Sequence, residues 1–317
     1  MNALEQLCQK IVKECVRLDK KETCLLVKDL ETSELHHGLE AAIHACGGVP
    51  WVLGLPEEAY AQGLLPRELE ATMASADVVL ICTRKIFPHK PRKSAAEAGA
   101  RVLSMCTVTK EIALRALDVD YDELSRVTRN LTDALSQASE VLFRSQAGTE
   151  IRMEITGQPT VYFDGLAREP GKSSVLPAGV VATVPLPETA EGKVVLDGSI
   201  ASIGLLRNPV TLRVKRGRIE EIQGNKEAKE LLRILEAADE NARCIAEVGL
   251  GTNPKATYIG NLVEDERVRG SGHIGLGRNT HLGGAIESSL HIDGTIGKPS
   301  IYLDGEAIVR EGNLIKH

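Results

Sequence analysis

The chain has 317 residues, and its 38 Lys and Arg residues against 44 Asp and Glu residues give a formal net charge of −6. This length predicts roughly two domains of about 150 residues each, and the mildly acidic balance argues against nucleic acid as a partner. No apolar run approaches the roughly 20 residues that span a bilayer, and residues 1–15 have the pattern of an amphipathic helix rather than of a signal peptide. We therefore expect a cytoplasmic protein that binds neither nucleic acid nor a membrane.

Seven cysteines are distributed unevenly along the chain, because six of them lie within the first 106 residues. Their number is odd, no pair has C-x-x-C spacing, and most lie within apolar runs such as VVLICT. These features favour buried, reduced thiols in a cytosolic protein over a disulfide framework or a zinc ribbon. The six are Cys8, Cys15, Cys24, Cys46, Cys82 and Cys106, and the seventh is Cys244.

Helical and strand patterns alternate along the first 140 residues. Residues 3–18 place apolar side chains at helical spacing, and the segment TCLLVKD that follows has the composition of a short buried strand. Strands that alternate with helices indicate a parallel sheet covered on both faces, so residues 1–140 are predicted to form an α/β domain. The predicted helices are 3–18, 33–46, 66–75, 108–117 and roughly 121–140, and the predicted strands are 23–29, 49–55, 76–83 and 101–106.

The pattern changes after about residue 140. Short strands with Gly, Pro and Asp at their turns now follow one another, VKRGRIEEI has the form of a hairpin, and one clear helix is expected over 226–239. Residues 141–317 are therefore predicted to form an α+β domain with mixed or antiparallel strands. The predicted strands are 140–146, 149–156, 159–165, 180–186, 193–200, 210–222 and 300–305.

One glycine pattern in this second domain resembles a dinucleotide-binding loop. Residues 270–275, GSGHIG, match G-x-G-x-x-G. That motif requires an apolar strand before it and a helix after it, and neither flanking segment fits. We therefore expect no dinucleotide site here, and we expect the glycines to let the backbone pass close to a site of another kind.

Acidic and histidine side chains gather between residues 247 and 293. His291 and Asp293 are two positions apart, so they project from the same face if their segment is a strand. His273, in a similarly apolar segment, and Glu247, in AEVGLGTNP, complete the predicted set of metal ligands. Imidazole with carboxylate suits Zn²⁺, Mn²⁺, Co²⁺ or Fe²⁺ better than Mg²⁺ or Ca²⁺. Such a partial shell leaves positions for water or substrate, which is the condition for catalysis in this second domain.

Other polar residues are interpreted as structural. The segment VEDER, residues 263–267, is most simply a solvated turn or the start of a helix. His36, His37 and His44 lie on a predicted helix, and His89 lies in a proline-containing loop. None of these histidines is assigned a functional role.

The order of several motifs resembles the M29 family of metallo-aminopeptidases, the aminopeptidase T group. The motifs are AGTEIRMEITG, LPAGVVATVP, GKVVLDGSI, AEVGLGTNP, EDERVRGSGHIGLG and SSLHIDG, and they cover most of residues 147–297. The resemblance implies a homodimeric two-metal hydrolase whose ligands are two Glu, two His, one Tyr and one Asp. Four of these ligand positions fall on Glu247, His273, His291 and Asp293.

Two ligand positions of that family are not retained. Its first Glu falls on Val180 and its Tyr falls on Thr280, and the nearby His281 and Glu188 are the accessory candidates that could substitute for them. Because two neighbouring cations repel each other, a metal pair needs bridging and terminal carboxylates. The four retained ligands are enough for one metal and few for two.

Three functions are consistent with these residues. The main prediction is a metal-dependent hydrolase resembling leucyl aminopeptidases of the M29 family. It would release N-terminal residues from short peptides through a water activated by Zn²⁺, Co²⁺ or Mn²⁺, with Glu247 as a catalytic ligand, or as general base if one metal binds.

The alternative is a mononuclear Fe(II) ring-cleaving dioxygenase that acts on a small molecule. His273, His291 and Asp293 form the 2-His-1-carboxylate set of non-haem iron oxygenases, and a second branch of the superfamily is similar to 2,5-dihydroxypyridine 5,6-dioxygenases. A third reading is a non-enzymatic descendant that has lost ligands and only binds a partner or small molecule.

Overall fold

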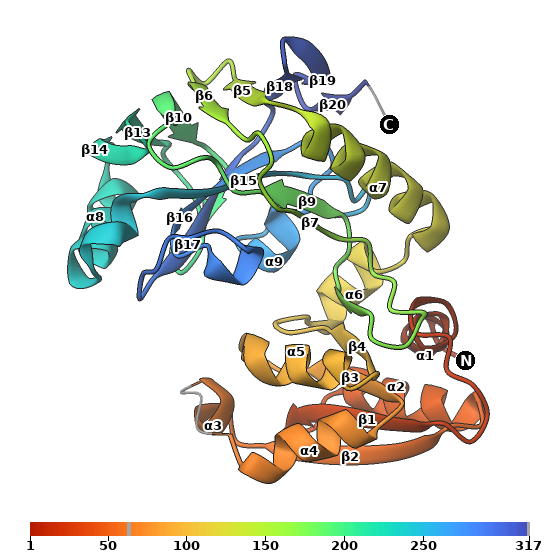
Figure 1. Cartoon of the computed structure of the whole chain (residues 1–317). Helices are drawn as coiled ribbons and strands as arrows, with labels where there is room; N and C mark the ends of the chain where they lie inside the picture. Colours follow the sequence, from red (N-terminus) through yellow and green to blue (C-terminus); the bar gives the residue numbers. More distant parts are fainter. Residues whose placement is uncertain (62–64, 316–317) are drawn as a thin grey trace. The chain divides into compact units, whose positions relative to one another are not determined.

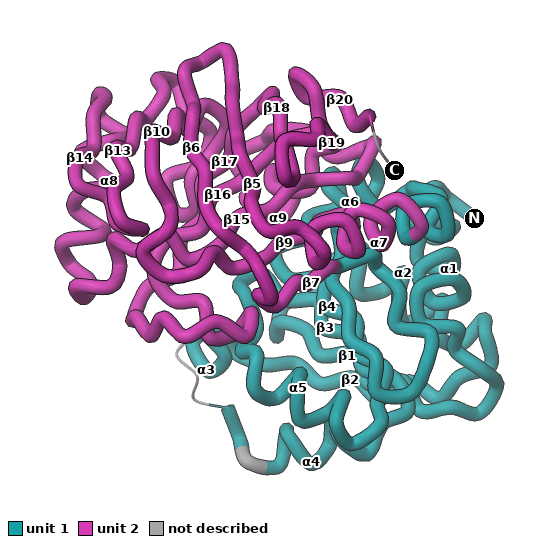
Figure 2. Tube along the Cα trace, turned by 45° about the horizontal axis from the view of Figure 1, so that its top comes forward, with its two compact units in different colours: residues 1–125, 163–178 teal, residues 126–162, 179–317 magenta. Residues whose placement is uncertain are grey.

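The computed structural model describes residues 1–61 and 65–315. The chain divides into two compact units, coloured separately in Figure 2: unit 1 contains Met1–Ser125 and Phe163–Ala178, and unit 2 contains Arg126–Tyr162 and Gly179–His317. The sequence pattern suggested a single change near residue 140. The structure instead returns to unit 1 for residues 163–178, and periodicity cannot show this because it reports local structure and not the sheet that a strand joins.

Unit 1 contains a five-stranded sheet in the order β2-β1-β3-β4-β8, and all of its strand pairs are parallel. This confirms the predicted α/β architecture with a parallel sheet. The last strand, β8, comes from the returning segment. The strands are β1 (Thr23–Asp29), β2 (Val49–Leu55), β3 (Val78–Cys82), β4 (Arg101–Ser104) and β8 (Ser173–Val175).

Helices cover both faces of this parallel sheet (Figure 1). Successive strand residues point to opposite faces, so Leu26 packs with α1, α2 and α6, whereas Leu25 packs with α3, α4 and α5. The first predicted helix is α1 followed by a short π-helical segment, Ile11–Cys15, and His89 begins a helix rather than lying in a loop. The helices are α1 (Ala3–Lys10), α2 (Glu34–Ala45), α3 (Glu57–Ala61), α4 (Arg67–Ser75), α5 (His89–Glu97) and α6 (Lys110–Ala116).

Unit 2 is built from two sheets whose strand pairs are antiparallel, as the sequence pattern predicted. One sheet has eight strands in the order β14-β13-β10-β6-β5-β18-β19-β20. Its strands are β5 (Glu140–Arg144), β6 (Glu150–Glu154), β10 (Glu191–Leu196), β13 (Val210–Lys215), β14 (Arg218–Gln223), β18 (Ser300–Leu303), β19 (Glu306–Arg310) and β20 (Asn313–Leu314). The pair β13–β14 is the predicted hairpin.

The second sheet of unit 2 has seven strands in the order β12-β11-β17-β16-β15-β9-β7. Its strands are β7 (Thr160–Phe163), β9 (Val180–Thr183), β11 (Ser199–Ile200), β12 (Gly204–Leu205), β15 (Ile245–Gly251), β16 (Gly272–Gly277) and β17 (His291–Ile296). The helices associated with this half of the chain are α7 (Tyr121–Gln137), α8 (Lys226–Ala237) and α9 (Leu262–Asp265).

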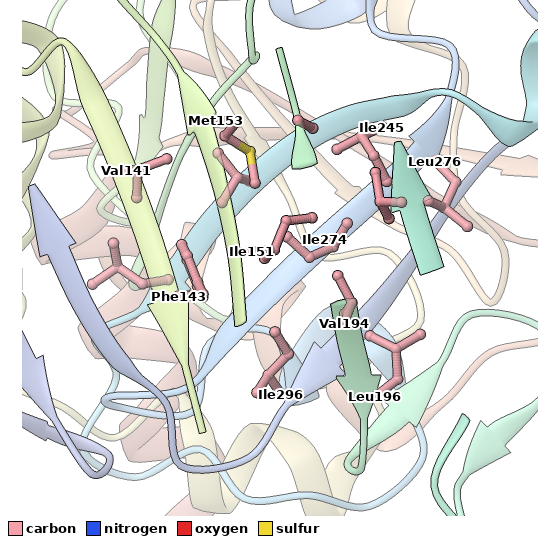
Figure 3. Close-up of a cluster of buried hydrophobic side chains, with 14 of the residues drawn as sticks. Val141, Phe143, Ile151, Met153, Val194, Leu196, Ile245, Ile274, Leu276 and Ile296 are labelled. Atoms are coloured by element: carbon pink, nitrogen blue, oxygen red, sulfur yellow. The ribbon is translucent and has the colours of Figure 1, made fainter. Parts of the chain in front are cut away.

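The core of unit 2 lies between its two sheets. Figure 3 shows side chains of β5 and β6, such as Phe143 and Ile151, beside Ile274 and Ile296 from the seven-stranded sheet. The apolar face of α8 packs against the same cluster through Leu231 and two neighbours. One face of the seven-stranded sheet is therefore committed to the core, and only its other face is available for polar side chains.

The structure agrees with the expectation of buried, reduced cysteines. All seven cysteines are free thiols, and five of them are buried. Burial raises the pKa of Cys15, Cys24 and Cys82 well above the ordinary value, as expected for inert core thiols. Within the described residues, no helix is long and apolar enough to cross a bilayer.

Candidate metal centre

Three neighbouring strands, β15, β16 and β17, carry the candidate site. Their side chains alternate between the two faces of the sheet. Val248, Ile274 and Ile292 point into the core of unit 2. The opposite face of the same strands, which we call the site face, carries Glu247 and His273 together with the other predicted ligands and several glycines.

The site face has a glycine between its two carboxylates. Gly275 of β16 lies directly opposite Glu247 on one side and Asp293 on the other. A Cβ atom at Gly275 would lie 2.6 Å from Oδ1 of Asp293 and 2.7 Å from Cβ of Glu247. In the neighbouring row, Gly249 lies opposite His273, and a Cβ there would collide with the imidazole. Glycine at these two positions therefore keeps open the space into which the donors point.

A β-bulge in β15 sets the direction of Glu247. The register with β16 shifts between Ile245 and Glu247, so Ile245 lies in the core although it is only two residues from a site-face residue. Asn279 fixes this bulge from the loop after β16, because its Nδ2 donates to the carbonyl of Ala246 at 3.0 Å and its Oδ1 accepts from the N–H of Ile286 at 2.8 Å. Bulges commonly redirect a side chain at a functional site.

The structure brings all four predicted ligands together. The carboxylate of Glu247 lies 3.3 Å from Nε2 of His273 through Oε1, and 3.3 Å from Nε2 of His291 through Oε2. Nε2 of His291 also lies 3.2 Å from Oδ2 of Asp293. His273, Glu247 and Asp293 are buried. Two imidazoles and two carboxylates thus converge over Gly275.

The electrostatics of this cluster follow from its burial. Burial alone would lower the pKa of His291, but the carboxylates of Asp293 and Glu247 outweigh that effect and raise it to about 11. Burial alone would raise the pKa of Glu247, but hydrogen bonds and charge from His273 and His291 lower it below the ordinary value. Each charge in the cluster is therefore stabilised by its neighbours.

The residues present fit a divalent transition metal. Oδ1 of Asp293 is buried and has no hydrogen-bond partner among the described residues, and it faces the space above Gly275. Nδ1 of His291 lies 2.7 Å from the carbonyl of Arg278, which can only accept, so Nδ1 carries a hydrogen and Nε2 faces the cluster, where a bound metal would replace its proton. Metal-binding imidazoles are commonly oriented by such a contact.

His281 also lies at the cluster. One ligand atom each from Glu247, His281 and His291 lie within 4.8 Å of one another, and the rings of His281 and His291 meet edge to face with centroids 4.5 Å apart. Loss of solvent and the nearby His291 charge lower the pKa of His281 to about 4. The other accessory candidate, Glu188, is instead paired with Arg216 at the surface.

The two positions that lack an M29-type ligand differ in setting. Val180 of β9 lies opposite Gly251 of β15, on the site face, so an aliphatic side chain stands where that family has a carboxylate. Thr280 begins the short 3-10 turn that carries His281. The glycines of residues 270–275 lead into strand β16, which confirms that no helix follows them.

Buried charges beside the site were missed in the sequence. Residues 262–265 form α9, so the expected helix at VEDER is present, but the expectation that it is solvated is wrong. Glu264 and Asp265 are fully buried and accept backbone N–H groups of the loop over 257–260. A charge run does not reveal such partners. Arg267 is also buried: burial lowers its pKa to about 10, and the carboxylates of Asp293 and Glu247 oppose that shift.

Unit 2 is a β-sandwich that brings imidazoles and carboxylates together on a glycine-rich face of one sheet. Such a donor set is typical of metalloenzymes. The family model of 2,5-dihydroxypyridine 5,6-dioxygenase (NicX) matches residues 4–316, and the chain belongs to this family. It is 28% identical over 265 residues to the 2,5-dihydroxypyridine 5,6-dioxygenase of Pseudomonas putida KT2440, across 78% of this chain and 73% of that protein. Membership of this family indicates that the chain is an enzyme.

Two solved structures share the fold. The 2,5-dihydroxypyridine dioxygenase of Pseudomonas putida KT2440 superposes with a TM-score of 0.86 at 22% identity, over 99% of this chain and 98% of that one. Wild-type AmpT from Thermus thermophilus superposes with a TM-score of 0.74 at 18% identity, over 99% of both chains.

The main prediction of an M29-type leucyl aminopeptidase is wrong. The family model and the sequence relative both indicate the dioxygenase family, whereas the similarity to AmpT is a similarity of fold. The motifs that suggested a peptidase include the strands β9, β15, β16 and β17, which build the sheet itself. Val180 and Thr280, where the resemblance implied a Glu and a Tyr, already departed from the peptidase pattern.

Proposed function

We propose that the chain is a mononuclear Fe(II) dioxygenase that cleaves the ring of a dihydroxylated N-heterocycle of the 2,5-dihydroxypyridine class. The observation that carries this proposal is the convergence of His273, His291 and Asp293 on one sheet face. Two imidazoles and one carboxylate are the donor set of non-haem Fe(II) oxygenases, and they leave coordination positions open. Membership of the dioxygenase family supports the same activity.

His273, His291 and Asp293 would hold the metal. When bound, Fe(II) supplies the redox chemistry that lets O₂ react with an aromatic ring. In the overall reaction the ring bond between carbons 5 and 6 breaks and both oxygen atoms enter the product. The carbonyl of Arg278 keeps the His291 ring in one orientation, and the strands β16 and β17 hold their donors at fixed spacing, so ordering the site costs little on binding.

Glu247 is assigned the role of general base. Its carboxylate is a second buried acid beyond the three-residue set, and it contacts the Nε2 atoms of both histidines. The Oε1 and Oε2 atoms lie beside the predicted ligands His273 and His291, so either oxygen can accept the proton of a substrate hydroxyl. The buried guanidinium of Arg267 offsets part of the negative charge of Glu247 and Asp293.

Iron reconstitution tests this function. We expect protein loaded anaerobically with Fe(II) to consume O₂ with 2,5-dihydroxypyridine in equal amounts and to bind one iron per chain. Asp293→Asn and His291→Ala should lose iron, whereas Glu247→Gln should retain iron and lose turnover by about 100-fold or more. Absence of O₂ uptake by iron-loaded protein across a panel of dihydroxypyridines would overturn the proposal.

A further inference from the structure

His281 reaches the ligand cluster from outside the sheet. The four predicted ligands lie on strands β15, β16 and β17, whereas His281 lies in the short 3-10 turn Thr280–Leu282 of the loop after β16. One ligand atom of its imidazole lies within 4.8 Å of ligand atoms of Glu247 and His291. We propose that His281 hydrogen-bonds the ring nitrogen of the substrate and so selects an N-heterocycle over an all-carbon ring. This inference rests on the proposed function and names the residue that recognises the nitrogen.

The turn that carries His281 is tied to the backbone beside Glu247. The carbonyl of Asn279 accepts the N–H of Leu282 at 2.9 Å, and the Leu282 side chain is buried. The side chain of the same Asn279 donates to the carbonyl of Ala246, the residue before Glu247, at 3.0 Å. One residue therefore links the turn to the strand, and the imidazole is positioned before a ligand arrives. Binding does not have to order it, which favours affinity.

The polar atoms of the His281 ring are available to a ligand. The ring meets that of His291 edge to face, with centroids 4.5 Å apart, and it forms no hydrogen bond with any residue that the structure describes. Two other polar side chains near Glu247 are already engaged. Asn279 bonds two backbone groups, and the guanidinium of Arg267 forms an ion pair with the neighbouring residue 266. His281 therefore keeps its nitrogen atoms for a partner that binds at the centre.

An imidazole matches the nitrogen of a hydroxypyridine in either of its tautomers. A neutral imidazole has one N–H donor and one acceptor nitrogen. It can donate to a pyridine nitrogen or accept from the N–H of the pyridone form, whereas the C–H of an all-carbon ring offers neither partner. The site face supplies no such group around Glu247, because Gly249 and Gly275 lack side chains and Val180 is aliphatic. Recognition of the nitrogen is therefore assigned to His281.

The roles of Glu247 and His281 are compatible with one small ring. Under the proposed function, Glu247 accepts the proton of a ring hydroxyl, and a nitrogen of His281 lies within 4.8 Å of its carboxylate. In 2,5-dihydroxypyridine the nitrogen is adjacent to the carbon that bears one hydroxyl and two ring positions from the carbon that bears the other. Whichever hydroxyl faces Glu247, the nitrogen therefore lies on a scale that matches the separation of these two side chains.

Ligand affinity in the absence of O₂ tests the nitrogen contact. The Fe(II)-loaded full chain then binds without turnover, so calorimetry can compare 2,5-dihydroxypyridine with hydroquinone, its all-carbon analogue. We expect the wild type to prefer the pyridine by about 10-fold or more, because hydroquinone leaves the imidazole without a partner. His281→Leu should lose this preference, and His281→Gln, whose amide also donates and accepts, should keep part of it. Glu287→Ala, at an exposed position of the same loop, is the matched control and should keep both affinities.

An N-methylated ligand tests which ring atom faces His281. The methyl group of 5-hydroxy-1-methyl-2-pyridone removes the hydrogen bond and occupies its place, so the wild type should bind this compound about 10-fold or more weakly than 2,5-dihydroxypyridine. His281→Ala makes room for the methyl group and should bind the methylated compound about 10-fold more tightly than the wild type does. Absence of this gain would place the nitrogen away from His281 and overturn the proposal.

Iron content and O₂ uptake separate this role from the others. His281→Leu should retain one iron per chain, and loss of its iron would make His281 a metal ligand and overturn the assignment. An unchanged preference for the pyridine in His281→Leu would also overturn it, while O₂ uptake by the wild type with 2,5-dihydroxypyridine would leave the proposed function intact. An iron-loaded wild type that binds neither compound and consumes no O₂ would overturn both.

Discussion

Gly275 lies directly opposite Asp293 across strands β16 and β17, and a Cβ atom on Gly275 would lie 2.6 Å from the Oδ1 atom of that carboxylate. The same Cβ would lie 2.7 Å from Cβ of Glu247. The space between the two carboxylates therefore exists because one strand position lacks a side chain. Four tests follow from this arrangement and from its surroundings.

Gly275→Ala should weaken metal binding while leaving the fold intact. The added methyl group occupies the space into which Oδ1 of Asp293 points, and its neighbours are backbone-anchored strands that cannot move apart cheaply. We expect the dissociation constant for Co²⁺, followed by its visible absorption, to rise by about 100-fold. Gly297→Ala is the control, because a Cβ there meets its nearest atom at an ordinary 3.4 Å. Unchanged Co²⁺ affinity in Gly275→Ala would place the metal elsewhere.

The metal-free protein should lose stability as the pH rises above neutrality. The pKa of His291 is about 11 in the folded chain against an ordinary 6.5, so the folded state holds a proton that the unfolded state releases. Its stabilisation is fully present below about pH 6.5 and is lost progressively toward pH 11. Urea unfolding of chelator-treated protein at pH 6.5 and pH 9 should show this loss, and His291→Gln should reduce the difference. Equal stabilities in the wild type would contradict the raised pKa.

Asn279→Ala should release the bulge that directs Glu247. The Asn279 side chain donates to Ala246 and accepts from Ile286, so its removal frees both backbone groups. If β15 slips to regular pairing, Ile245 and Glu247 share a face. We expect metal affinity to fall by about 10-fold or more. Asn241→Ala, which removes an exposed bond to the Glu287 carbonyl, should have no such effect.

Asp265→Asn should destabilise unit 2 through the loop that contains Tyr258. Oδ1 and Oδ2 of the fully buried Asp265 accept the N–H groups of Ile259 and Gly260 at 2.8 and 2.9 Å. An amide would set a donor against one of these donors, at a cost of about 1–3 kcal/mol. Asp304→Asn is the matched control, because the exposed Asp304 also accepts two backbone N–H groups. Denaturant unfolding should show a larger loss of unfolding free energy for Asp265→Asn than for Asp304→Asn. Equal losses in the two variants would argue against an effect of burial.

The sequence predicted the architecture and the residues of the site better than the directions in which the side chains of the site point. Alternation of helix and strand patterns was enough for the parallel sheet, and the spacing of His291 and Asp293 was enough to place both on one face. Neither β15 nor β16 was among the predicted strands, because glycine is disfavoured in strands and both segments are glycine-rich. The bulge was also invisible, since a strict two-residue period puts Ile245 and Glu247 on the same side.

Other features depend on contacts between distant segments. Asn279 had no signal in the sequence, because its role arises from two backbone groups that only the fold brings near. The burial of Glu264 and Asp265 depends in the same way on the loop that donates to them. The return of residues 163–178 to unit 1 adds β8 to a sheet formed some 70 residues earlier, from β4 at Arg101–Ser104. Periodicity carries no record of such partners.

The glycines of the site face make room for the metal donors but contribute no side chain to substrate recognition. Gly249 and Gly275 give the centre a floor of backbone beneath its donors, and this floor offers no side chain to distinguish one aromatic ring from another. Discrimination must then come from side chains outside the floor, such as His281 in the loop 278–290, which lies beside Glu247 and His291. Substrate range should therefore change when the residues of this loop are exchanged, while Gly275 and the donors can stay as they are.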